Sequence, residues 1–302
     1  MSSIRKILLI GLVTLLASCS NQSTTSDNGK LTIVATTTML ADLANKIGGE
    51  AVTVTGLMGP GIDPHLYQAS AGDVIKLQDA DVVLYNGLHL EGKMGDLFSS
   101  LGEQGRNMIS IEDGFDVNDL LEDSENPGYY DPHVWFDVEL WRNAAEHVTS
   151  ELSTIDSDNT SSYQSNLESY YRELSKLEEY INDRFTEIPE NQRILVTAHD
   201  AFGYLGKAYG IEVVGLQGIS TDAEAGTSDV RQLAQFIEEN QIKAIFVESS
   251  VPPKNIEALQ DAVIARGFEV EIGGQLYSDS LGDGNYIDTF RENIDTIVDA
   301  LK

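Results

Sequence analysis

The chain has 302 residues, of which 49 are acidic and 19 are basic, so its net charge at pH 7 is −30. This charge argues against nucleic acid as a partner, because binding phosphates requires the opposite sign. An apolar content of 41% is enough for one large core or two moderate ones, and a single cysteine excludes a disulfide within the chain.

The first 18 residues predict a secretory signal of the lipoprotein type. Arg5 and Lys6 precede an apolar run that is shorter than the roughly 20 residues a membrane-spanning helix needs. The small residues that end this run, followed by Cys19, resemble the bacterial lipoprotein signal. We therefore expect a signal peptide at 1–18, a lipid on Cys19, a flexible tether at 19–29 and an extracytoplasmic, membrane-anchored protein. The alternative is a free cysteine inside an ordinary signal peptide.

Eight short β-branched runs, each followed by a helix-like segment, predict parallel strands covered by helices. Four runs lie in each half of the chain. The predicted strands are 31–36, 51–57, 81–87, 108–111, 193–198, 211–216, 243–249 and 268–272. The predicted fold is therefore α/β with two lobes, each holding a mostly parallel sheet flanked by helices.

A single long helix is predicted between the lobes. The segment 158–187 has neither glycine nor proline, and its apolar residues recur at gaps of three and four, which indicates one buried stripe. At 1.5 Å per residue the helix is roughly 45 Å long and acts as a stiff strut. We predict an N-terminal lobe at 30–155, the linking helix at 156–189 and a C-terminal lobe at 190–302.

Three of the five histidines stand in contexts that favour a metal site. His65 and His133 each follow an Asp-Pro pair, and His199 follows the predicted strand 193–198. Proline restricts its own backbone and that of the residue before it, so each Asp-Pro-His presents its ring from a stiff turn. Ligands of α/β proteins collect at the carboxyl ends of strands. Borderline transition metals favour imidazole nitrogens that converge from rigid positions.

Each histidine also has a purely structural interpretation. A histidine after Asp-Pro can cap a turn, and His199 can be hydrogen-bonded beneath the next helix. The three lie too far apart along the chain for a local zinc finger, as expected when each lobe offers loops to a shared cleft. Of the other two histidines, His147 is interpreted as a helix-face residue, and His89, beside Glu91, as a structural one.

These motifs, together with LYSDSL at 276–281, resemble the metal-binding solute-binding proteins of manganese and zinc ABC transporters. The resemblance covers about residues 31–302 and includes NGLHLE at 86–91 and FVE at 246–248. It implies a monomeric binding protein that captures Mn²⁺ or Zn²⁺ outside the cytoplasm and delivers it to a membrane permease. The metal ligands that it implies are His65, His133, His199 and Asp279.

The choice between the two metals depends on the fourth ligand and on one loop. Binding through one oxygen of Asp279 gives a tetrahedral shell suited to Zn²⁺, whereas binding through both suits Mn²⁺. Zinc-dedicated members of the family often carry a histidine-rich loop. The corresponding region, 113–130, has no histidine, which favours manganese.

Three carboxylates are candidates to orient the ligands. Glu248 ends a predicted strand and is placed to accept the ring N–H of a ligand histidine. Asp63 and Asp131 can do the same, although their alternative role is turn formation. We also expect only modest opening of the cleft around the stiff helix, with Asp279 as the ligand that moves on release.

Two other functions compete with metal delivery. A zinc metallohydrolase requires an open coordination position and a positioned base. The sequence has no His-Glu-x-x-His run, no Gly-x-Ser-x-Gly elbow and no phosphate-binding loop, so we predict no enzymatic activity. The second is an adhesin or interaction lipoprotein that uses the metal structurally, which would lose its fold when the metal is stripped.

Overall fold

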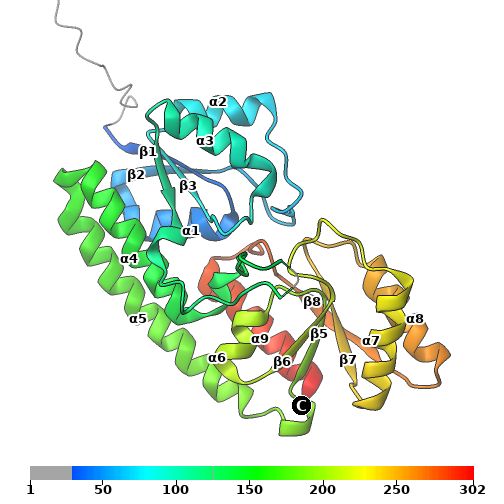
Figure 1. The fold of residues 1–302 in the computed structure, drawn as a ribbon. Helices are drawn as coiled ribbons and strands as arrows, with labels where there is room; N and C mark the ends of the chain where they lie inside the picture. Colours follow the sequence, from blue (N-terminus) through cyan, green and yellow to red (C-terminus); the bar gives the residue numbers. More distant parts are fainter. Residues whose placement is uncertain (1–28, 125) are drawn as a thin grey trace, which may run out of the picture.

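The computed structural model describes residues 29–124 and 126–302 (Figure 1). The predicted signal peptide and Cys19 lie outside the described residues. Within the part of the chain that is described, no helix combines the length and the apolar character needed to cross a membrane.

The N-terminal half is built on a four-stranded parallel sheet in the order β2-β1-β3-β4. Residues on alternating positions of β1 and β3 face opposite sides, so one face packs on α1 and the other on α2 and α3. The Thr37 side chain caps α1, and Ser70 and Asp73 form a capping box at the start of α2. The elements are β1 (Leu31–Ala35), α1 (Thr38–Gly48), β2 (Val52–Gly56), α2 (Ala71–Asp79), β3 (Val82–Tyr85), α3 (Gly95–Glu103) and β4 (Asn107–Ser110).

The C-terminal half holds two parallel strand pairs, β5 with β6 and β7 with β8, and β5 packs beside β7. Its elements are β5 (Ile194–His199), α6 (Gly203–Tyr209), β6 (Glu212–Gln217), α7 (Thr227–Glu239), β7 (Ala244–Glu248), α8 (Lys254–Ala265), β8 (Glu271–Leu276) and α9 (Tyr286–Leu301). All eight predicted strands are present. The last begins at Glu271 rather than Phe268 and runs on through Gly273 and Gly274, beside a register shift at Ile245 and Phe246.

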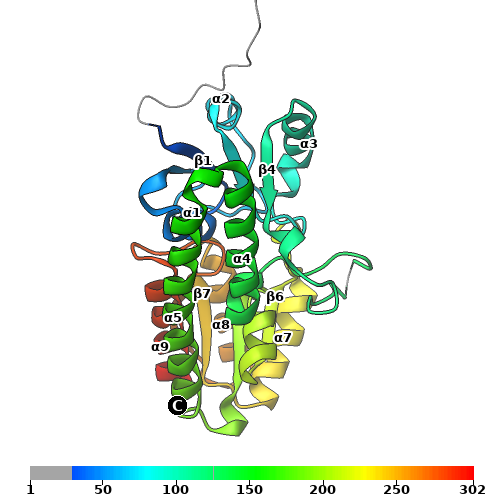
Figure 2. The ribbon, with the colours of Figure 1, turned by 90° about the vertical axis from the view of Figure 1, so that its left-hand side faces the viewer.

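Two helices connect the halves along one side of the molecule (Figure 2). α4 (Val138–Ile155) packs on α5 (Thr160–Phe185), which also contacts α1 in the N-terminal half and α6 and α9 in the C-terminal half. The long helix is confirmed just inside its predicted bounds, at about 39 Å for 26 residues. Its stripe is buried as predicted, except that Leu167 is only partly covered.

One continuous apolar core spans both halves. It includes Ile33 and Leu40 from the N-terminal half, Leu174 from α5, and Phe246 and Ile297 from the C-terminal half. The linking helix is therefore packed along its length rather than free-standing between two separate lobes. The division into lobes at 30–155 and 190–302 stays a prediction.

Candidate metal centre

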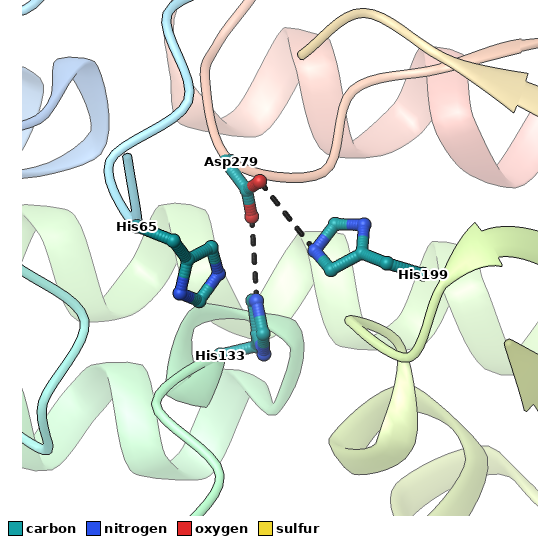
Figure 3. A group of neighbouring side chains, drawn as sticks. All are labelled: His65, His133, His199 and Asp279. Atoms are coloured by element: carbon teal, nitrogen blue, oxygen red, sulfur yellow. Dashed lines mark ion pairs between the residues drawn. The ribbon is translucent and has the colours of Figure 1, made fainter. Parts of the chain in front are cut away.

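Four side chains from distant parts of the sequence meet between the two halves. One ligand atom from each of His65, His133, His199 and Asp279 lies within 4.8 Å of the others, and all four residues are buried. Figure 3 shows the three rings and the carboxylate facing a common point from four different segments. The structure thus brings together the four residues that the sequence singled out, and their role as metal ligands stays a prediction.

The two Asp-Pro-His turns share one local hydrogen bond. The backbone N–H of His65 donates to Asp63 Oδ1 at 2.8 Å, and that of His133 donates to Asp131 Oδ1 at 2.9 Å. Each aspartate therefore closes a tight turn that presents the histidine two residues later. The turn-forming role suggested for both aspartates is present in the structure.

His199 is the last residue of β5, and a glycine beside it allows the strands to approach closely. A Cβ at Gly215 on β6 would lie 2.5 Å from the backbone nitrogen of Asp200 and 2.8 Å from the carbonyl carbon of His199. Any larger side chain at this position has to push the strand end away. The placement of His199 thus depends on a glycine that the sequence analysis did not single out.

Carboxylates hold two of the three rings from behind. His133 Nδ1 lies 2.7 Å from Asp131 Oδ1, and His199 Nδ1 lies 2.5 Å from Glu248 Oε2. When Nδ1 carries the proton and donates it to a carboxylate, the Nε2 lone pair is free to bind a metal. Asp63 differs from the other two, because its second oxygen accepts the hydroxyl of Thr221 at 2.7 Å.

The atoms that face the centre have no hydrogen-bond partner among the described residues. They are the Nε2 atoms of the three histidines and Oδ1 of Asp279, and all four are buried. Buried polar atoms normally have partners, because leaving one without costs about 1–3 kcal/mol. Three nitrogens and one carboxylate oxygen form a donor set that suits a divalent transition metal.

The electrostatics of the metal-free site follow from burial and from its carboxylates. Burial lowers the pKa of His65 to about 3. Burial also opposes the charged form of His133, but Asp131 and Asp279 outweigh it and raise the pKa of this ring to about 9. The pKa of His199 is likewise raised by Glu248 and Asp279 against burial. Burial raises the pKa of Asp279, yet the surrounding histidines bring it well below its usual value.

Hydrogen bonds from several segments fix the loop that carries Asp279. The indole Nε1 of Trp135 donates to the carbonyl of Ser278 at 3.0 Å, and the backbone N–H of Gly61 donates to Ser280 Oγ at 2.8 Å. The backbone N–H of Leu281 donates to Thr38 Oγ1 at 2.7 Å. The N-terminal half of the molecule therefore helps to fix the loop of the C-terminal half that carries this carboxylate.

Aromatic side chains pack beside His133 and in the segment that follows it. The Trp135 ring lies edge-on to His133 with a centroid separation of 5.2 Å. The ring centroids of Phe136 and Phe202 are 4.4 Å apart, and both residues are buried. Trp135 and Phe202 are thus packing residues rather than members of the group of four.

The other two histidines lie away from the centre. His147 is on α4 and packs closely on Gly114: a Cβ added at Gly114 would lie 2.7 Å from the Cβ of His147. His89 is exposed, and its ring is tilted against that of Tyr129 with a centroid separation of 4.3 Å. Neither residue belongs to the group of four.

A buried glutamate supports the His133 turn from a distance, a role that the sequence analysis did not foresee. Glu91 accepts the hydroxyl of Thr36 at 2.6 Å and the backbone N–H of Asn86 at 2.9 Å. The amide of Asn86 in turn donates to the carbonyl of Pro132 at 3.1 Å. The NGLHLE segment was noted only as part of the resemblance, and nothing in one sequence pairs it with the second Asp-Pro-His.

Comparison with known proteins places the chain among metal-uptake proteins. A family profile described as zinc-uptake complex component A, periplasmic, matches residues 33–300. The zinc-binding protein TroA of Treponema pallidum is 45% identical, with 98% of this chain and 96% of TroA covered. The manganese-binding lipoprotein MntA of Bacillus subtilis is 46% identical, with 92% of each chain covered.

Solved structures agree with these sequence relationships. The periplasmic zinc-binding protein TroA from Treponema pallidum matches with a TM-score of 0.87 at 47% identity, covering 90% of this chain and 99% of that one. A manganese-bound mutant of the periplasmic metal-binding protein from Candidatus Liberibacter asiaticus matches with a TM-score of 0.80 at 28% identity, covering 90% of this chain and 100% of that one.

Proposed function

The chain belongs to the family of periplasmic zinc-uptake components, and on that premise we propose that it is the metal-binding component of an ABC importer. It captures a divalent transition metal outside the cytoplasm and delivers it to a membrane permease. We assign the ligand role to His65, His133, His199 and Asp279. The relatives TroA and MntA are named for binding zinc and manganese.

The observation that carries this proposal is the set of four buried atoms without partners, converging from both halves of the molecule. A metal ion satisfies all four at once, and it binds only when the two halves are together. Glu248 and Asp131, each on the far nitrogen of a ligand histidine, support the same interpretation.

We propose manganese as the cargo, on the absence of histidine from residues 113–130. TroA is named for zinc and MntA for manganese, at nearly the same identity to this chain. Zinc binds most nitrogen and oxygen sites more tightly than manganese, so affinity in vitro does not identify the cargo. Elemental analysis of protein purified without added metal, followed by competition between the two ions, distinguishes them. Zinc retained against excess manganese in cells would contradict the proposal.

We further propose that the mature protein is a monomer anchored by a lipid on Cys19. MntA and the PsaA protein of Streptococcus pneumoniae, a relative 29% identical to this chain, are both named as lipoproteins. Mass spectrometry of the mature N-terminus tests the modification, and Cys19→Ser should release the protein from membranes. Recovery of that variant in the membrane fraction would contradict the anchor, and size-exclusion chromatography with light scattering tests the monomer.

The ligand assignment is tested by comparing two histidines. His133→Ala should lower the affinity for Mn²⁺ and Zn²⁺ by orders of magnitude, because it removes a proposed ligand. His147→Ala is the matched control on α4 and should bind as the wild type does. Isothermal titration calorimetry measures both, with circular dichroism to confirm folding. Equal losses in the two variants would show that the site has been placed wrongly.

A further inference from the structure

Two serine hydroxyls form a short chain that ends on the carboxylate of Asp279. Ser250 Oγ lies 3.1 Å from Asp279 Oδ2 and 2.9 Å from Ser278 Oγ. Ser250 is in the loop after β7, two residues beyond Glu248, and Ser278 precedes Asp279. Neither serine is one of the four proposed ligands.

The direction of this hydroxyl chain follows from the number of hydrogens. A serine hydroxyl carries one hydrogen, and that of Ser250 is donated to Asp279, which as a carboxylate can only accept. The hydroxyl of Ser278 must then donate to Ser250. The series of hydrogen bonds therefore runs from Ser278 through Ser250 to Asp279. It is anchored at Ser278, whose backbone carbonyl accepts a hydrogen bond from Trp135.

Both oxygens of Asp279 face the histidines in this arrangement. Oδ1 lies 3.3 Å from His133 Nε2, and Oδ2 lies 3.4 Å from His199 Nε2 (Figure 3). Rotation of the carboxyl group about its last bond has a broad energy profile, so the side chain alone does not hold this orientation. Ser250, which is not a proposed ligand, donates the hydrogen bond that holds Oδ2 beside His199.

We propose that Ser250 is a positioning residue that keeps both oxygens of Asp279 available to the metal and thereby favours Mn²⁺ relative to Zn²⁺. Mn²⁺ takes more than four donors and uses the second oxygen, whereas Zn²⁺ is satisfied by three nitrogens and one oxygen. The inference rests on the proposed function and deepens it. It assigns part of the metal selectivity to a residue outside the four ligands.

The test compares Ser250→Ala with Ser249→Ala. Ser249 is the adjacent serine, and its Oγ is buried with no hydrogen-bond partner among the described residues, so it is a matched control. Ser250→Ala should weaken Mn²⁺ binding about tenfold and Zn²⁺ binding much less, since loss of an outer partner commonly costs 10–100-fold. Ser249→Ala should leave the ratio of the two dissociation constants unchanged.

Bound Co²⁺ provides a readout that a loss of stability does not change. Its visible absorption is stronger with four donors than with five or six, so the absorption should rise in Ser250→Ala and stay at the wild-type level in Ser249→Ala. Ser278→Ala is a second variant, in which Ser250 loses the hydroxyl that orients it, and should show a smaller shift in the same direction. Thermal unfolding of the metal-free variants confirms that each is folded.

The outcomes separate this inference from the proposed function. If the wild type binds neither Mn²⁺ nor Zn²⁺, the proposed function fails. If the wild type binds both, and Ser250→Ala leaves the affinity ratio and the Co²⁺ spectrum unchanged, the role of Ser250 is overturned alone. Equal shifts in Ser250→Ala and Ser249→Ala would overturn it as well.

Discussion

Glu248 holds His199 at two points. Its Oε1 accepts the backbone N–H of His199 at 2.9 Å, and its Oε2 lies 2.5 Å from the ring Nδ1. The two residues end the neighbouring strands β7 and β5, and both are buried. One carboxylate thus fixes the end of a strand, the orientation of a ring and the nitrogen that carries its proton.

Replacing this carboxylate by an amide should weaken metal binding. In Glu248→Gln the charge is lost, and an amide offers one oxygen where the carboxylate offers two. We expect the affinity for Zn²⁺ and Mn²⁺ to fall about 10–100-fold, as measured by calorimetry. Glu257→Gln, an exposed substitution on α8, is the control and should have no effect. Wild-type affinity in Glu248→Gln would contradict the orienting role.

Metal binding should release protons and strengthen as the pH rises. The pKa of His133 is raised to about 9, so this ring is protonated at pH 7 without metal, and the pKa of His199 is raised in the same direction. A metal needs neutral rings, so binding has to displace any proton that these two rings carry on the metal-facing nitrogen. His65, with a pKa lowered to about 3, releases none. Calorimetry in buffers of different ionisation enthalpy counts these protons.

The stability of the metal-free protein should depend on pH in the opposite sense. A raised pKa in the folded state means that His133 stabilises the metal-free fold below about pH 6.5 and that this contribution is lost as the pH rises through about 9. The gain in melting temperature on adding Zn²⁺ should therefore increase from pH 6 to pH 9. Affinity that stayed constant between pH 7.5 and pH 5 would contradict metal binding through His133 and His199.

Shortening one side chain of α5 tests the continuous core. Leu177 is fully buried on this helix, so Leu177→Ala should lower the free energy of unfolding by about 2–5 kcal/mol. Leu167→Ala, on the same stripe but only partly buried, should cost clearly less. Urea denaturation with a chelator present measures both. Equal costs would contradict the packing described for the helix.

Release of the metal should involve the Asp279 loop more than the two Asp-Pro-His turns. Hydrogen exchange with and without metal should show the larger change at 277–284, where hydrogen bonds to Gly61 and Thr38 must break for the loop to leave. The turns at His65 and His133 are closed locally and should change less. The reverse pattern would remove Asp279 from the release step.

The sequence predicted the elements of the fold because their signals are local. A β-branched run or a stripe with gaps of three and four is visible within a few turns of chain, as in the helix over 158–187. Two features of the sheets depend on contacts between distant residues. One is the register shift at Phe246, and the other is that β5 pairs with β6 in a sheet of two strands. Such contacts leave no pattern within one segment.

The candidate site divides in the same way. His65 and His133 were found because an Asp-Pro-His triplet is stiff, and His199 because it follows a predicted strand. Asp279 came only from the resemblance to a family. Ser250 was missed because serine is common and its partner lies far along the chain. Recognising it requires the distance between two loops, which no spacing in one sequence provides.

The four side chains of the metal centre are spread along the chain from position 65 to position 279, close to its C-terminal end. A chain made from its N-terminus therefore carries the three histidines well before the carboxylate exists. During synthesis, the complete set of proposed ligands is absent until position 279 has been added. The order of the residues thus delays capture by the four proposed ligands until both halves of the site have been made.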